Sequence, residues 1–499
     1  MATPADIEAR LRAREARVER WRRAWWDGPT DLPYRALCLA WFVASLARCT
    51  LMEAGQPSWW IATGVLVLGS VQLVWRGGRI GWLLSLVGLL VPLWWLGDWL
   101  TQSVILALIA AVGVATTRAP DRDEPASTPS GSTDGETQDA RRAEGATAMP
   151  LRAVGVAAHA LVASTYFVAV FHKLNAGFID PVASCANHGW RQLGAALVFD
   201  LPLPDPLAAA MPWLVLATEL TVGVLVARRS RWAIPVGVAL HVPFTLALAP
   251  AFAFVMAVGY VAATPGEVLD RAWRGLRERA PRRAAEAAAI AAATVALTPG
   301  FDVVMGIKVA LLVQLAVVVH PGLWRDVTPS PAPKRARAWA LAVVAGFGLN
   351  AATPYLGTQM QHTGAMLSNL RIDTACSNHL VVPATLRLVD PYVRIDAASL
   401  GNAEHGTLGA YPDDELALRS ILWSTTALRS MRRNWCTERT RPIRLEGTFL
   451  GEPLVIEDLC DPATPLPRGP GAFGGPGVFD GYLRLQKNLP RSCAMTCVH

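Results

Sequence analysis

Four ionisable side chains interrupt long apolar runs and are the first candidates for chemistry. Lys173 follows His172 near the end of one run, and Glu219, His241 and Lys308 lie inside later runs. A charged group in hydrocarbon is costly, so such residues usually face protein or water and are candidates for function. A partly buried lysine can release a neutral amine and act as a base, because desolvation penalises the ammonium form.

Helical geometry predicts the depth of these groups in a membrane. At about 1.5 Å of rise per residue, Glu219 and His241 lie roughly 13 to 15 Å from the basic residues that mark the inner boundary. They share a depth, so a contact of His241 or of the slightly shallower His159 with Glu219 is expected. Lys173 lies about 30 Å from Arg152, at the outer interface. For Glu219 and His241, the alternative is a structural hydrogen bond between helices. For Lys173, the alternative is a side chain that reaches the lipid headgroups.

A second polar group follows the last apolar run, where Asn369 and Arg371 precede Asn378 and His379. Amides, a guanidinium and an imidazole so close together can line the outer mouth of a pocket, although turns and caps also use Asn for local reasons. No HExxH, P-loop or GxSxG motif occurs in the sequence. The commonest metalloprotease, nucleotide-driven and hydrolase functions are therefore not indicated, whereas transport is left open.

The composition indicates that a membrane protein carries these candidates. Of the 499 residues, 52% are hydrophobic and 17% charged, where soluble domains average about a quarter charged. The chain has 19 Trp, a residue that membrane interfaces favour. A spanning helix needs about 20 mainly apolar residues. We predict about eleven spans, with ten the main rival, at 34–52, 57–75, 80–97, 99–117, 152–174, 207–227, 232–249, 250–264, 285–299, 301–320 and 338–354.

The distribution of Lys and Arg predicts the orientation. With the N-terminus in the cytosol, the inner connections carry 27 Lys and Arg, whereas the outer connections before Pro354 carry only Arg191. Cytoplasmic loops are the ones enriched in these residues. The net charge of +7 is therefore a signal of topology and of attraction to anionic lipid, and no nucleic-acid partner is predicted.

The predicted fold class is an all-α polytopic membrane helical bundle with a small C-terminal extracytoplasmic domain that is β-rich or α+β. Alternating residues between Ile443 and Asp458 predict a β-hairpin there, and 270–283 is expected to form an amphipathic helix on the inner surface. Five parts follow in order: a cytosolic Arg-rich segment 1–33, a four-span portion 34–117, a disordered cytosolic linker 118–150, a seven-span portion 151–354 and the extracytoplasmic domain 355–499.

Cysteine usage agrees with this topology. Of eight Cys, five lie in the external domain and Cys185 lies in the outer loop after the fifth span. An oxidising outer compartment permits disulfides, although the spacing leaves their pairing open. Cys493, Cys497 and His499 are ligands of zinc type, but a fourth ligand is missing and no metal is predicted.

The run Ser164-Thr-Tyr-Phe-Val-Ala-Val-Phe-His-Lys-Leu-Asn175 resembles the lysine-bearing helix of the vitamin K-dependent γ-carboxylase and its bacterial relatives, the horizontally transferred transmembrane (HTTM) family. Glu219-Leu-Thr-Val-Gly and His241 are similar to the family's next two helices. Residues 366–371 and 377–383 resemble the external segment that bacterial members carry after their last helix. The resemblance covers about residues 34–440.

This resemblance implies a carboxylase-like lyase or quinol epoxidase in the bacterial cytoplasmic membrane. In the carboxylase, the lysine that matches Lys173 is the base that activates reduced vitamin K for reaction with oxygen. The strong base so formed removes a γ-proton from a substrate Glu, and carbon dioxide adds. The implied partners are the lipid bilayer, reduced vitamin K or menaquinone, and a secreted peptide or protein. We expect Lys173, His172, Glu219 and His241 to be catalytic, and Tyr166, Asn175, Asn369, Arg371, Asn378 and His379 to line the substrate pocket.

Two departures from the family keep other functions open. The carboxylase also relies on a histidine before the lysine-bearing helix, but the first His of this chain is His159, inside that helix. The external domain is also much smaller than that of the carboxylase. The alternatives are a non-catalytic accessory protein for maturation or export of a secreted peptide or toxin, and a transporter.

Overall fold

A computed structural model provides the structure of the chain. It describes residues 31–49, 57–91, 101–117, 134–198, 201–298 and 302–357, with gaps at 248, 250 and 330. It also describes parts of residues 8–19 and parts of the C-terminal region between 363 and 497. Most of the Arg-rich segment and residues 118–133 of the predicted linker lie outside the described residues.

Eleven helices of the described chain coincide with the predicted apolar segments. They are α2 (Leu32–Cys49), α3 (Pro57–Trp75), α4 (Arg79–Val91), α5 (Thr101–Thr116), α6 (Asp134–Lys173), α9 (Asp205–Ala227), α10 (Ala233–Ala247), α11 (Phe252–Ala263), α13 (Ala280–Leu297), α14 (Val303–Val318) and α15 (Lys334–Leu356). Between α11 and α13, the amphipathic helix α12 (Gly266–Glu278) lies close to its predicted position.

The helices support a membrane protein, but their lengths differ. Four stretches are long and apolar enough to cross a bilayer within the described chain: Ala153–Lys173 of α6, α9, Val303–Trp324 and α15. The pair α11 and α12 makes a fifth if it is counted as one broken span, with a bend of 114° at the break. The number of spans and their orientation therefore remain predictions.

The disordered linker expected at 118–150 differs from the structure in its second half. Helix α6 begins at Asp134 and continues without a break into the apolar stretch that ends at Lys173. Residues 138–144 are mostly Gln, Ala, Arg and Glu, which favour helix. Extending a helix that has already formed costs far less than starting one, so the apolar stretch supplies the nucleus.

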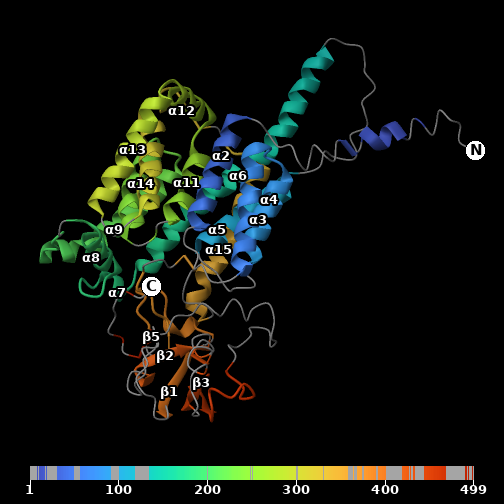
Figure 1. Ribbon diagram of the computed structural model, residues 1–499. Helices are drawn as coiled ribbons and strands as arrows, with labels where there is room; N and C mark the ends of the chain where they lie inside the picture. Colours follow the sequence, from blue (N-terminus) through green and yellow to red (C-terminus); the bar gives the residue numbers. More distant parts are fainter. Residues whose placement is uncertain are drawn as a thin grey trace, which may run out of the picture.

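Helix α6 is the central element of the bundle, because it packs against α5, α9, α11 and α15. In Figure 1, α2 to α5 lie on one side and α9 to α14 on the other. Small residues allow the close approach: a Cβ atom built on Gly259 of α11 would lie 2.3 Å from Cβ of Val162 on α6. The helices that line the site described below are thus held at short distance from the one that carries Lys173.

Two short helices follow α6, where only a loop was expected. Asn175 caps α7 (Ala176–Ile179) by accepting from the N–H of Phe178, and Ser184 caps α8 (Cys185–Ala196) by accepting from that of Ala186. Side chains of Asn and Ser at these positions satisfy backbone donors that a helix start leaves free.

The C-terminal region contains a small antiparallel sheet of strand order β4-β3-β1-β2-β5 (Figure 1). Its strands are β1 (Tyr392–Ser399), β2 (Ile421–Ser424), β3 (Arg444–Phe449), β4 (Glu452–Ile456) and β5 (Leu489–Pro490). The predicted hairpin is confirmed as β3 and β4. Its two turn residues, Leu450 and Gly451, both have positive φ, at 56° and 85°, as a tight hairpin turn requires.

Disulfides, which the sequence predicts on the outer side, are present. They join Cys185 to Cys497, Cys376 to Cys493 and Cys436 to Cys460. The first two attach the C-terminal end to α8 and to the segment that follows α15. Because Cys493 and Cys497 are both bridged, neither is a free thiolate for a metal.

Candidate functional site

A pocket lies between α6, α9, α10 and α11, and its space measures about 430 Å³, including the part open to the exterior. Its wall is mostly apolar and is formed by Thr165, Tyr166, Ala169, Lys173, Glu219, Leu240, His241, Phe244, Ala249, Phe252 and Met256. The α6 residues recur at the spacing of one helix face. Half-buried Leu240, Phe244 and Ala249 mark the more open side.

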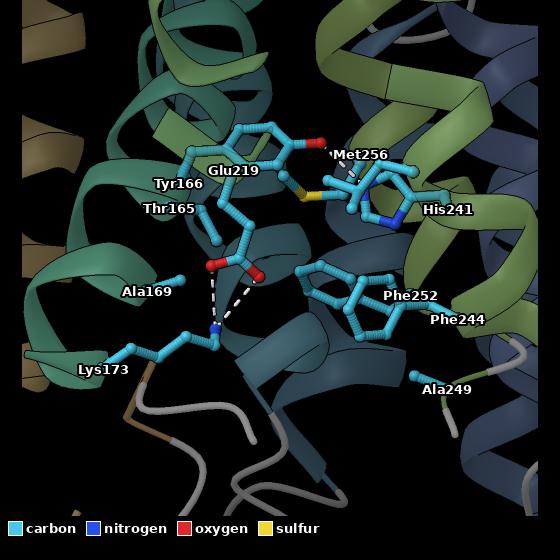
Figure 2. Close-up of a pocket in the computed structure, with 11 residues that line it drawn as sticks. Thr165, Tyr166, Ala169, Lys173, Glu219, His241, Phe244, Ala249, Phe252 and Met256 are labelled. Carbon is cyan, nitrogen blue, oxygen red and sulfur yellow. Dashed lines mark hydrogen bonds and ion pairs between the residues drawn. The ribbon is translucent and has the colours of Figure 1, made fainter. Parts of the chain in front are cut away.

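A buried ion pair forms one side of this pocket. Nζ of Lys173 donates to Oε1 of Glu219 at 3.0 Å and lies 2.9 Å from Oε2. Lys173 is 2% exposed and Glu219 7% exposed, so water screens the two charges little. Figure 2 shows the two side chains pointing toward each other, with Phe252 and Phe244 across the space. Removal of either partner would leave the other as an uncompensated charge.

The pair forms because α6 and α9 are antiparallel neighbours. Residues of the two helices meet in reverse order: His159 with Val226, Tyr166 with Gly223 and Lys173 with Glu219. Side chains lean toward the N-terminus of their helix, so Lys173 leans away from the outer end of α6 while Glu219 leans toward it. The depth estimate from the sequence considered only backbone rise and thus placed Lys173 and Glu219 apart.

Tyr166, His241 and Tyr260 form a hydrogen-bonded group, and Figure 2 shows the first two above the ion pair. The hydroxyl of Tyr166 lies 2.6 Å from Nε2 of His241 and also bonds the hydroxyl of Tyr260. The structure thus gives His241 a tyrosine partner, where the sequence suggested Glu219. Gly237 makes room for this arrangement, since a Cβ there would lie 2.4 Å from the Tyr260 hydroxyl.

The other candidate groups within the helices lie apart from the pocket lining. His172, next to Lys173, is buried against Tyr355 of α15, with ring centroids 5.4 Å apart. Adjacent helical residues point about 100° apart, so His172 and Lys173 face different neighbours. Nε2 of His159 lies 2.7 Å from the carbonyl of Val226, and Lys308 is buried on α14.

Directly beyond Lys173, three buried asparagines hold the outer segment against the end of α6; we call Asn175, Asn369 and Asn378 the asparagine clamp. Nδ2 of Asn175 donates to the carbonyls of His172, at 2.8 Å, and Ser368, at 2.5 Å. Its Oδ1 accepts from the Phe178 N–H and from Nδ2 of Asn378. The hydrogen-bonding capacity of this amide is fully used.

The other two members of the clamp extend the network. Asn378 donates to the carbonyl of Asn369 at 2.8 Å and accepts from the N–H of Arg371 at 2.8 Å. Asn369, in the left-handed region with φ 54°, accepts from the N–H of Cys185 and donates to the carbonyl of Ala183. The clamp therefore connects α6, the start of α8 and the segment after α15.

Arg371 and His379 also have structural partners. Arg371 forms a buried two-point ion pair with Asp373, at 2.8 Å and 3.1 Å. Nδ1 of His379 accepts from the N–H groups of Val381 and Val382, so Nε2 carries the proton that it donates to the Phe171 carbonyl at 3.0 Å. Burial lowers the pKa of His379, which favours this neutral form.

Apart from His172, which packs against Tyr355, the predicted site residues fall into two groups. Tyr166, Lys173, Glu219 and His241 line one pocket. Asn175 and the four external residues (Asn369, Arg371, Asn378 and His379) are not among its lining residues, and they fix the end of the lysine helix instead.

The sequence did not predict the apolar part of the wall near α10 and α11 or the role of Tyr260. This part consists of Leu240, Phe244, Ala249, Phe252 and Met256. The sequence signal for this wall was α11, which is apolar on all sides. A helix of that composition is expected to be buried among other helices or in a membrane. A tyrosine within such a helix needs a polar partner, and that requirement pointed to a nearby histidine or tyrosine.

Removal of one charge at a time tests the burial of the pair. We expect Glu219→Leu or Lys173→Met alone to lower the free energy of unfolding by about 3–5 kcal/mol, because one charge stays buried without its partner. The double variant is expected to recover most of this loss, as measured by denaturant unfolding in detergent. If each single variant loses no more free energy of unfolding than the double variant, the two charges do not form a buried pair.

Disruption of the clamp is expected to loosen the outer segment. Asn175→Ala leaves buried donors and acceptors without partners, at about 1–3 kcal/mol each. We expect hydrogen exchange in residues 368–379 to accelerate at least about tenfold. Gln192→Ala, an exposed amide on α8, is the matched control and should leave exchange unchanged. Equal exchange in both variants would show that Asn175 does not hold the segment.

Comparisons with protein-family models, with curated proteins and with solved structures find no match to this chain. The resemblance to the HTTM family therefore remains an expectation from the motifs quoted above, and the function proposed below depends on the geometry of the pocket.

Proposed function

We propose that the chain is an integral membrane enzyme of the carboxylase type, in which Lys173 acts as a base toward a reduced quinone. The observation that carries the proposal is the Lys173 and Glu219 pair on the wall of an apolar pocket among four helices. A base that must act on a lipid-soluble molecule needs both features, because the molecule requires apolar walls and the proton requires a polar acceptor.

The ligand that we propose for the pocket is a flat aromatic headgroup of the reduced vitamin K or menaquinone type. Phe244, Phe252 and Met256 supply apolar surface, and aromatic rings pack well against one another. The space reaches about 430 Å³ only when the part open to the exterior is included, so the pocket itself is small. A folded protein segment is too large for it, so a peptide substrate would approach from the outer side.

The residues of the chain then act in a defined order. The Lys173 ammonium first passes a proton to the Glu219 carboxylate, which leaves a neutral amine. Nζ of Lys173 next takes the hydroxyl proton of the bound quinol, so one O–H bond breaks and one N–H bond forms. Glu219 keeps the first proton, and its acid form leaves no second negative charge beside the new anion. Tyr166 and His241, which also line the pocket, provide further hydrogen-bonding groups.

The quinol, when bound and deprotonated, would supply the electron-rich ring that reacts with oxygen, as the resemblance implies. Carboxylation would then act on a substrate at the outer face, where the clamp joins the lysine helix to the external domain. We propose a secreted peptide or another extracytoplasmic molecule as that substrate, and the bacterial cytoplasmic membrane as the location.

Epoxide formation tests this function. Purified protein in lipid nanodiscs receives reduced menaquinone or reduced vitamin K with oxygen, and quinone epoxide is measured by mass spectrometry. We expect Lys173→Ala to lower the rate by about 10²-fold or more, since a positioned base contributes about 10²–10⁴-fold. Lys308→Ala is the matched control, because Lys308 is also a buried helical lysine but lies outside the pocket lining, and it should retain the rate.

Rescue separates chemistry from folding in the same assay. A small primary amine in solution is expected to restore part of the epoxide formation by Lys173→Ala, because the truncated side chain leaves space beside Glu219. Epoxide formed equally by wild type and Lys173→Ala, or by neither, would contradict the proposal. If neither protein forms epoxide, the result would favour the accessory function, in which the ion pair only joins α6 to α9.

A further inference from the structure

A short apolar segment outside the helical bundle exposes large aliphatic side chains. Within residues 380–388, Leu380 is 59% exposed, Val381 65%, Leu386 52% and Leu388 75%. Single exposed apolar residues are ordinary on a protein surface, but a group of them marks a surface that contacts a membrane or another protein. The position of the segment decides between the two.

Backbone hydrogen bonds fix the segment at the ends of two helices. The N–H of Leu380 donates to the carbonyl of Leu174 at 3.0 Å, directly after α6, and the N–H of Leu388 donates to that of Leu356 at 3.1 Å, the last residue of α15. Between them, Ala384–Leu386 forms a 3-10 turn. Because α6 and α15 are both long and apolar enough to cross a membrane, the segment lies at the level where they leave it.

Helix α15, whose last residue bonds the segment, also exposes large apolar side chains. Leu341 is 71% exposed and Leu349 is 73% exposed, and their separation of eight residues places them on one broad face. In a membrane-spanning helix, such a face contacts lipid or another membrane helix. Within residues 380–388 themselves, the only charged side chain is that of Arg387.

We propose that residues 380–388 rest on the outer surface of the bilayer, with Leu380, Val381, Leu386 and Leu388 in contact with the acyl chains of the outer leaflet. Arginine can keep its charged head at the phosphates while its stem lies along apolar surface, which suits the single charge of Arg387. A protein partner would not require the segment to be bonded to the ends of two helices that can cross a membrane. The contact attaches the external segment to the membrane beside the asparagine clamp. This inference does not depend on the proposed enzymatic activity.

Spin labelling at matched positions tests this contact. A nitroxide is attached to Leu386→Cys, and separately to Val455→Cys on β4, in a background where the free Cys38 and Cys49 are replaced by Ala. Leu386 and Val455 are both 52% exposed, so they differ mainly in location. Both proteins are placed in phosphatidylcholine and phosphatidylglycerol nanodiscs, and non-reducing peptide mapping verifies the three disulfides.

The readout is collision with oxygen, which concentrates in hydrocarbon, relative to collision with a water-soluble nickel chelate. We expect a several-fold higher ratio at Leu386 than at Val455, and the same result at Leu388→Cys. A ratio at Leu386 equal to that at Val455 would place the segment in water and overturn the proposal. Exclusion of both reagents from Leu386 would overturn it too, because protein would then cover the segment.

Discussion

The buried ion pair between Lys173 and Glu219 is the constraint on which the rest of the site depends. Neither charge can remain in an apolar interior alone, so α6 and α9 must stay in one register. Tyr166, two turns before Lys173 on the same face of α6, is then placed against His241 of α10. The pair thus determines both the geometry of the pocket and the chemistry that the pocket can perform.

The outer end of the lysine helix is fixed as firmly as its middle. Asn175, two residues after Lys173, uses its whole amide in hydrogen bonds to His172, Ser368, Phe178 and Asn378. The segment that carries Asn369 and Asn378 is bridged through Cys376 to Cys493. The external domain is therefore linked to the proposed base by a chain of direct contacts.

Much of this organisation was predictable because single residues carry strong signals in a membrane protein. Apolar runs predict the helices, and the cost of a buried charge singles out Lys173 and Glu219. Their pairing was missed because depth was counted along the backbone, whereas side chains lean toward the start of each helix. Asn378 was assigned to a pocket from its type alone, although an amide serves backbone groups equally well. Its true partners depend on how segments distant in sequence meet, which spacing does not encode.

The most direct measurement of the central claim is a cryo-electron microscopy structure in nanodiscs with menaquinone, kept reduced under anaerobic conditions. The account predicts ring density beside Phe244 and Phe252, with a ring oxygen about 2.6–3.2 Å from Nζ of Lys173, as proton transfer requires. A headgroup bound elsewhere on the protein, with Lys173 still contacting only Glu219, would contradict it.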